Sequence, residues 1–150
     1  MPELNWLDLG AATAARTLLL RALTDADGPA QRLAQGRDGA ALHDFRVALR
    51  RLRTTERAYR SSLGESGLPK KLRRRLRRLV RDTGAARDAE VHLALLAGPR
   101  EILRPHQRAG LRWFEQHLHA RLRREDARLR ERLRRDFPRL RNKLETHLRA

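Results

Sequence analysis

The chain has 150 residues with a hydrophobic content of 40%, which suits one domain with a single core rather than two domains. Its 35 lysine and arginine residues outnumber the 18 aspartate and glutamate residues, and the net charge of +17 indicates a polyanionic partner or an acidic surface. The lack of cysteine excludes disulfides and thiolate metal sites, and no apolar run approaches the roughly 18 residues of a membrane span.

Helical periodicity runs along the chain, and no period-two strand pattern is found. We predict a first helix over about residues 4–24, ended by the breaker Asp-Ala-Asp-Gly-Pro at 25–29. Residues 30–39 then form a connecting turn, with room for a short helical piece. Charged residues interrupt the apolar N-terminal stretch and no basic region precedes it, so we predict no signal peptide.

A second helix is predicted over about residues 40–62, and its side chains form two stripes. Apolar residues recur at intervals of three and four and form a face that must be buried, namely Leu42, Phe45, Leu49 and Leu52. A basic stripe lies about 120° away and extends over roughly 20 Å, namely His43, Arg46, Arg50, Arg53 and Arg57. Since like charges at i and i+4 repel each other, the stripe indicates an anionic ligand, and a solvated basic face is the alternative.

A third helix is predicted over about residues 70–83, after a loop with Gly64, Gly67 and Pro69 and before Gly84 as a C-terminal cap. Its predicted buried face consists of Leu72, Leu76, Leu79 and Val80. If the second and third helices form an antiparallel hairpin, the same angular offset places a second basic row across one groove from the first. That row consists of Lys70, Arg73, Arg77 and Arg81.

The C-terminal half is predicted to contain three further helices. Arg87 and Asp88 open a short helix that ends at Gly98 and Pro99, with the aspartate placed to cap it or to hold an arginine. A long helix over about 105–136 has a mixed-charge outer face, which we interpret as solvated structure. Its apolar seam consists of Leu111, Phe114, Leu118, Leu122, Leu129 and Leu133. Pro138 separates it from a last helix over 139–149.

Two motifs in this pattern are His43-x-x-Arg46-x-x-x-Arg50-Arg51-x-Arg53 and Thr83-Gly84-x-x-Arg87-Asp88-x-x-Val91. Together they resemble the CHAD family, the conserved histidine α-helical domain. The resemblance implies an all-helical domain that binds inorganic polyphosphate through a basic surface, with no catalysis of its own. It also implies which residues occupy motif positions, namely His43, Arg46, Arg50, Arg51, Arg53, Arg81, Arg87 and, as a structural partner, Asp88.

Members of that family usually contain two such blocks in a pseudo-two-fold arrangement, whereas this sequence contains one, because His117 and His119 lack the spacing of a second. Either the chain dimerises to restore the missing half, or it is a shortened form with a reduced binding surface. The long apolar seam, about 45 Å by helical rise, favours a homodimer with two grooves side by side. The competing arrangement is a monomer in which residues 140–148 fold back over the seam.

We therefore expect residues 1–150 to form an all-α antiparallel bundle of about five to six helices, resembling one half of a CHAD domain. The expected ligand is polyphosphate, because guanidinium groups bind phosphate with two charge-assisted hydrogen bonds. Nucleic acid is the main alternative, since its backbone presents the same phosphates. Against it, aromatic residues make up 4% of the chain and none lies in the basic stripe. An adaptor for an anionic granule or membrane surface is a further alternative.

We expect no enzymatic activity and no cofactor, because the sequence has no glycine-rich phosphate loop, no Glu-x-Glu-x-Lys motif and no nucleophile beside a base. A metal site is not expected either, since His117 and His119 point to nearly opposite sides of a helix. His43 either donates to phosphate or bonds the backbone or Asp88 to fix helix packing. The expected location is cytoplasmic, in association with polyphosphate granules.

Overall fold

The computed structural model describes residues 10–36, 38–96, 98 and 103–150. In these ranges the chain forms seven α-helices and one 3-10 turn and contains no strand, so the predicted all-α class is confirmed. The elements are α1 (Ala11–Asp25), α2 (Asp27–Gln35), α3 (Gly39–Ala58), α4 (Arg60–Leu63), η2 (Gly64–Ser66), α5 (Lys70–Leu95), α6 (Pro105–Arg135) and α7 (Phe137–Arg149).

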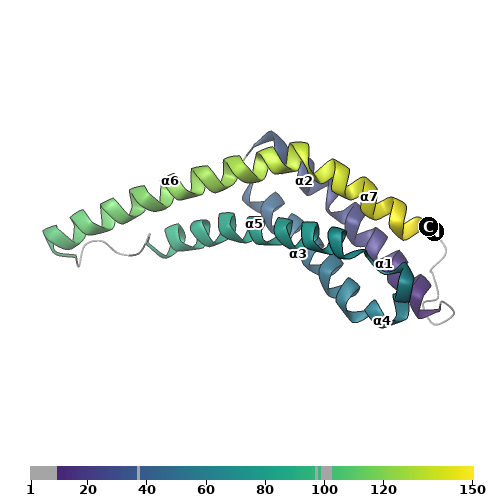
Figure 1. The fold of residues 1–150 in the computed structure, drawn as a ribbon. Coiled ribbons are helices and arrows are strands. Elements are labelled where there is room, and N and C mark those ends of the chain that lie inside the picture. The colour runs from purple at the N-terminus through teal and green to yellow at the C-terminus, as the bar shows by residue number, and fades with distance from the viewer. Residues whose placement is uncertain (1–9, 37, 97, 99–102) are drawn as a thin grey trace.

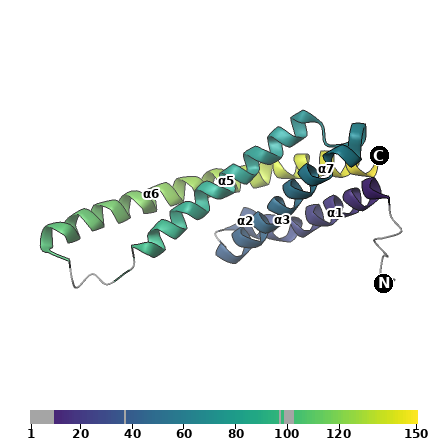
Figure 2. The same ribbon diagram turned by 90° about the horizontal axis from the view of Figure 1, so that it is seen from below.

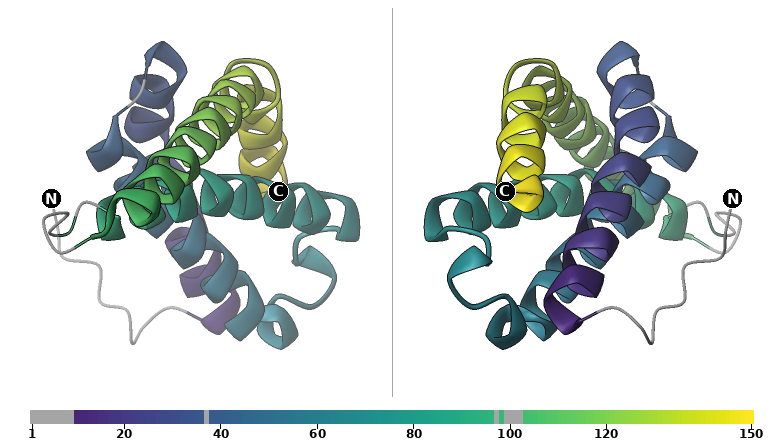
Figure 3. Two further views of the ribbon diagram at one scale, coloured as in Figure 1. Left: turned by 90° about the vertical axis from the view of Figure 1, so that its left-hand side faces the viewer. Right: turned by 90° about the vertical axis from the view of Figure 1, so that its right-hand side faces the viewer.

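The two longest helices, α5 and α6, lie side by side and antiparallel, and α7 continues beyond the end of α6 (Figure 1). The remaining helices cluster around the half of α5 that lies nearer its N-terminus. Consequently the far end of the α5–α6 hairpin projects beyond the other helices (Figures 1 and 2). Seen along the long axis, α5 lies between α6–α7 on one side and α3 on the other (Figure 3). This position gives α5 two separate flanks.

The core is built mainly from leucine and alanine side chains of α1, α2, α3, α5, α6 and α7. Phe45 of α3 is fully buried and meets Phe137 of α7 edge to face, with ring centroids 5.3 Å apart. The predicted apolar face of α3 is buried throughout, from Leu42 to Leu52. Because this face is held in the core, the basic stripe about 120° away from it is directed outward.

The interval 30–39, predicted as a connecting turn with room for a short helical piece, contains most of the helix α2, and the predicted breaker at 25–29 covers the end of α1 and the first turn of α2. Pro29 has no backbone N–H, but the N–H groups of a first turn have no partner within the helix, so proline is tolerated there. Burial of Ala30 and Leu33 in the core then stabilises the helix. In the described residues α1 begins at Ala11, and the predicted stretch 4–9 lies outside them.

The predicted end of the third helix at Thr83 is wrong, because α5 continues without interruption to Leu95. A glycine inside a helix costs about 1 kcal/mol relative to alanine, which is why Gly84 suggested a cap. Burial of Ala86 and Ala89 against neighbouring helices favours continuation instead. Arg87 and Asp88 therefore lie within α5 rather than at the start of a separate short helix, and the predicted capping role of Asp88 is wrong.

The predicted start of the long helix at Pro105 is confirmed, and the last helix, predicted over 139–149, starts two residues earlier at Phe137, with Pro138 in its first turn. Within the seam of α6, the residues from Leu118 to Leu133 are buried, while Phe114 is 44% exposed. The seam is covered by α5 and α2, and α7 packs against α1 and α5. The arrangement in which residues 140–148 fold back over the seam is therefore wrong.

Candidate functional site

The basic stripe of α3 forms one wall of a groove of about 750 Å³ between α3 and α5. All five side chains predicted for the stripe line this groove, namely His43, Arg46, Arg50, Arg53 and Arg57. The opposite wall comes from α5 and consists of Val80, Thr83 and Arg87, which are spaced at i, i+3 and i+7 and so share one face. The continuation of α5 past Thr83 is what adds Arg87 to this wall.

The five stripe residues make no ion pair with a carboxylate within the part of the chain that the structure describes. By contrast, Arg87 on the opposite wall pairs with Glu90 at 3.0 Å. Like charges at i and i+4 on one helix face repel each other by some tenths of a kcal/mol per pair. A row of uncompensated cations along one groove is thus a surface to which a linear polyanion is attracted along its whole length.

The floor of the groove offers few neutral hydrogen-bond donors. Thr83 is buried, and its hydroxyl donates to the carbonyl of Val80 at 2.8 Å, so this proton is used within the helix. Val47 and Ala58 are the other small apolar side chains of the lining. Thr54 supplies the other hydroxyl of the lining, so most of the polar groups open to a ligand are the charged side chains of the rim. Such a lining suits phosphate or carboxylate groups better than a neutral molecule.

The second predicted basic row does not face the first across one groove. Lys70, Arg77 and Arg81 line a separate hollow of about 840 Å³ on the exposed side of α5, together with other basic side chains of that helix. The reason is the rotation of α5 about its axis. Its leucine face packs between α3, α6 and α7, which turns Val80, Thr83 and Arg87 toward α3 and leaves the predicted row on the next face.

Arg73, the fourth member of that row, has a structural partner. Its Nη1 lies 3.6 Å from the carboxylate of Glu56, and Arg60 donates two further hydrogen bonds to the same carboxylate, at 3.1 and 3.0 Å. Glu56 is 5% exposed, and a buried carboxylate requires such partners. This cluster joins α3, α4 and α5 beside Arg57, at one end of the groove.

Three further predicted residues lie in different surroundings. Arg51 points toward α1, where its Nη1 is 4.0 Å from the carboxylate of Asp25, so it does not line the groove. Asp88 is exposed on α5 and makes no hydrogen bond or ion pair with the described residues, and its role as a structural partner stays a prediction. His43 is exposed at the groove and makes no helix-packing hydrogen bond within the same ranges, which favours the ligand-facing alternative.

Sequence reasoning missed four basic residues that extend the exposed hollow of α5, namely Lys71, Arg74, Arg75 and Arg78. Each of them stands three residues before an arginine of α5, and this helical spacing is the signal that could have identified them. In the described ranges there is no group of three or more histidine, cysteine, aspartate or glutamate residues placed to hold a metal ion. None of the helices described is long and apolar enough to cross a membrane.

Comparison with known families gives one result that bears on this groove. The family model of the CHAD domain matches residues 14–150, which includes the whole of α3 and α5 and both motifs. Neither the curated proteins nor the solved structures contain a significant match to the chain. Since the family match covers nearly the whole sequence, the chain belongs to the CHAD family.

Proposed function

We propose that the chain binds inorganic polyphosphate in the groove between α3 and α5, without catalysing a reaction and without a cofactor. The observation that carries this proposal is the wall of five basic side chains on α3 with no carboxylate partner in the described residues. The wall extends over roughly 20 Å, which suits a linear polymer of phosphates better than a single anion. Membership of a family associated with polyphosphate binding supports the same ligand.

The chemistry of the side chains favours phosphate. The guanidinium groups of Arg46, Arg50 and Arg53 remain charged at any cellular pH and donate paired hydrogen bonds to phosphate oxygens. His43, at one end of the wall, is placed to donate a further N–H to phosphate. Arg87 reaches the ligand from the opposite wall, where its pairing with Glu90 fixes its position.

Nucleic acid presents similar phosphates, but its single strands are held by aromatic side chains on which bases stack. No aromatic residue is found among the described residues that line the groove. The test is a competition experiment in which long-chain polyphosphate is bound to the protein and duplex DNA is added at equal phosphate concentration, over a range of salt. We expect DNA to displace little polyphosphate. Efficient displacement would show that the groove binds polyanions without selectivity and would favour the nucleic-acid alternative.

We further propose that the chain forms a homodimer through the projecting end of the α5–α6 hairpin. Four large apolar side chains are exposed there, namely Val91 at 39%, Leu95 at 73%, Trp113 at 66% and Phe114 at 44%. Clusters of exposed apolar residues mark interaction sites. The net charge of +17 opposes association of two copies, so a polyanion that spans both grooves would favour the dimer.

Light scattering at several protein concentrations, with and without long-chain polyphosphate, tests this assembly. We expect a dimer mass that is lost when Trp113 and Phe114 are both changed to Ser. A monomer mass at all concentrations, with and without the polymer, would contradict the proposal.

We also propose that the protein is associated with polyphosphate granules in the cytoplasm. Fluorescence co-localisation in cells would test this, by comparison with a groove variant.

A further inference from the structure

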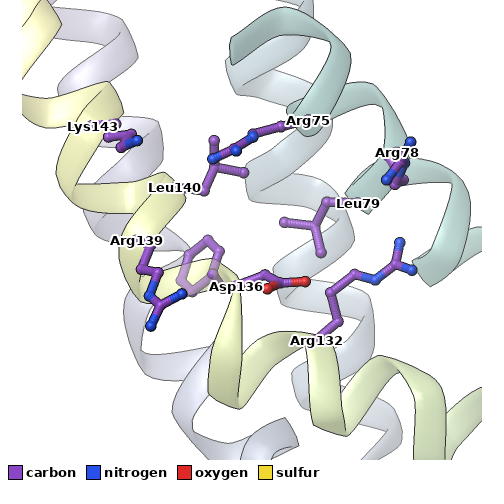
Figure 4. A pocket seen from close by; sticks show the side chains of 9 residues that line it. Arg75, Arg78, Leu79, Arg132, Asp136, Arg139, Leu140 and Lys143 are labelled. Carbon is purple, nitrogen blue, oxygen red and sulfur yellow. The ribbon is translucent and has the colours of Figure 1, made fainter. Parts of the chain in front are cut away.

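A second basic hollow, of about 350 Å³, lies on the side of α5 that faces α7 (Figure 4). Its floor is apolar and consists of Leu79, Phe137 and Leu140. Basic side chains from three helices surround it, namely Arg75 and Arg78 of α5, Arg132 of α6, and Arg139 and Lys143 of α7. Among the described residues of the lining, Asp136 is the one carboxylate. The hollow is thus a positively charged site separate from the groove on α3.

The hollow results from the junction of α6 and α7. Asp136 ends α6, and Pro138 cannot continue its hydrogen-bond pattern, so α7 takes a new direction (Figure 1). Phe137 is anchored in the core against Phe45, and Leu140 is buried on the next turn. Because α7 is fixed by these contacts, Arg139 and Lys143 project from a rigid helix rather than from a loop.

Most of the charge around this hollow is not neutralised by protein carboxylates. Arg132 is engaged with Asp82 of α5, and Asp136 lies 3.8 Å from the Nε of Arg135. The other four cations, Arg75, Arg78, Arg139 and Lys143, form no ion pair within the described residues. Four uncompensated cations from two helices therefore meet at one concave site, where an anion would relieve their mutual repulsion.

This hollow is connected to the groove by a continuous basic surface. Arg75 and Arg78 line both the hollow and the exposed side of α5, where Arg77 and Arg81 also lie. Arg77 and Arg81 lie three residues before and one residue after Val80 of the groove wall, and both line the exposed side of α5. At 3.6 residues per turn they follow Val80 round the helix, so basic side chains continue from the flank that faces α3 to the flank that faces α7. The basic surface between the groove and the hollow is therefore formed by residues of the helix α5.

We infer that α5 and α7 form a second phosphate-binding site, and that one polyphosphate chain runs from the α3 groove across the exposed side of α5 into it. The inference rests on the proposed function and extends it, since it assigns Arg139 and Lys143 to the binding surface. Its consequence is a dependence on chain length. A long polymer engages both sites at once and gains from effective concentration, whereas a short one occupies a single site.

The experiment compares long-chain polyphosphate binding by three proteins. The first is the unaltered chain, the second carries Arg139→Ala and Lys143→Ala, and the third is a control with Arg123→Ala and Arg124→Ala. The control removes the same charge from exposed positions of α6 that line neither site. We expect the α7 variant to lose about tenfold or more in affinity, which corresponds to one charged hydrogen bond, and the control to change by less than about twofold.

Equal losses in the α7 variant and the control would overturn the inference, because net charge alone would then account for both. Unchanged affinity in the α7 variant, with binding by the unaltered chain intact, would overturn the second site and leave the groove as the binding site. Absence of binding by the unaltered chain would refute the proposed function itself. A second variant, Lys143→Glu, repeats the test with a single exposed substitution, and circular dichroism checks that each protein keeps its helical content.

Discussion

Replacement of Arg46, Arg50 and Arg53 by Ala removes the middle of the groove wall and leaves the fold intact. Arg46 is half-buried and the other two are exposed, and no described carboxylate depends on any of them as a partner. Their apolar neighbours on α3 are held in the core independently of the stripe. Loss of polyphosphate binding in this variant would therefore report on the groove and not on folding.

The size of the effect follows from the contacts removed. A hydrogen bond to a charged group contributes about 1.5–3 kcal/mol, and we take about 1 kcal/mol for each arginine because solvent screens these partly exposed groups. Three losses then amount to about 3 kcal/mol, or a rise of about 100-fold in Kd. If polyphosphate behaves like a single-stranded polyanion, the slope of log K against log salt should also become less steep by about 2.

The assay is equilibrium binding of long-chain polyphosphate at several salt concentrations. The matched control replaces Arg121, Arg123 and Arg124 of α6 by Ala, because these three are exposed and form no ion pair within the described ranges. We expect its affinity to fall by only a few-fold, through net charge. If both triple variants lost the same affinity and the same salt dependence, the reasoning from a specific groove would be refuted.

Two predictions concern stability. Glu56→Gln should lower the free energy of unfolding by about 1–2 kcal/mol in a urea titration, because a buried carboxylate that holds two arginines is lost. As a control, Glu131→Gln at an exposed position should change the free energy of unfolding by less than about 0.5 kcal/mol. Equal effects of the two substitutions would contradict the structural role of Glu56. A backbone N–H at the start of α3 lowers the pKa of Asp38, and the hydrogen bond from Arg149 lowers the pKa of Glu145. A carboxyl group whose pKa is lowered by folding stabilises the fold at any pH above its ordinary pKa, which is 3.8 for Asp38 and 4.5 for Glu145. This contribution is lost as the pH falls through the lowered pKa. The melting temperature should therefore decrease when the pH is lowered below about 4.5. The decrease should be smaller in a variant with Asp38→Asn and Glu145→Gln. An identical pH profile in that variant would be inconsistent with the role assigned to these two carboxyl groups.

The wall of the groove on α3 could be predicted because it depends only on helical geometry. Once Phe45 and Leu49 are assigned to the core, the position of Arg46 and Arg50 follows from 3.6 residues per turn. The opposite wall could not be predicted in the same way. It depends on how far α5 continues and how it is rotated, and Gly84 gave a local signal for a helix end that burial of neighbouring alanines outweighs.

The hollow between α5 and α7 was beyond sequence reasoning for a different reason. Its basic residues lie on α5 (Arg75 and Arg78), on α6 (Arg132) and on α7 (Arg139 and Lys143), and the pair on α5 is far from the others in the chain. Helical periodicity shows which residues share a face of one helix, but it does not show which faces of different helices meet. These side chains are brought together by the packing of α7, in which Phe137 meets Phe45 and Leu140 is buried in the core.

The most direct test of the account is a crystal structure of the protein with long-chain polyphosphate bound. The account predicts a row of phosphates along α3, with the guanidinium groups of Arg46, Arg50 and Arg53 within hydrogen-bond distance of phosphate oxygens and Arg87 on the opposite side. An ordered polymer along the outer face of α6, with the groove between α3 and α5 empty, would contradict it.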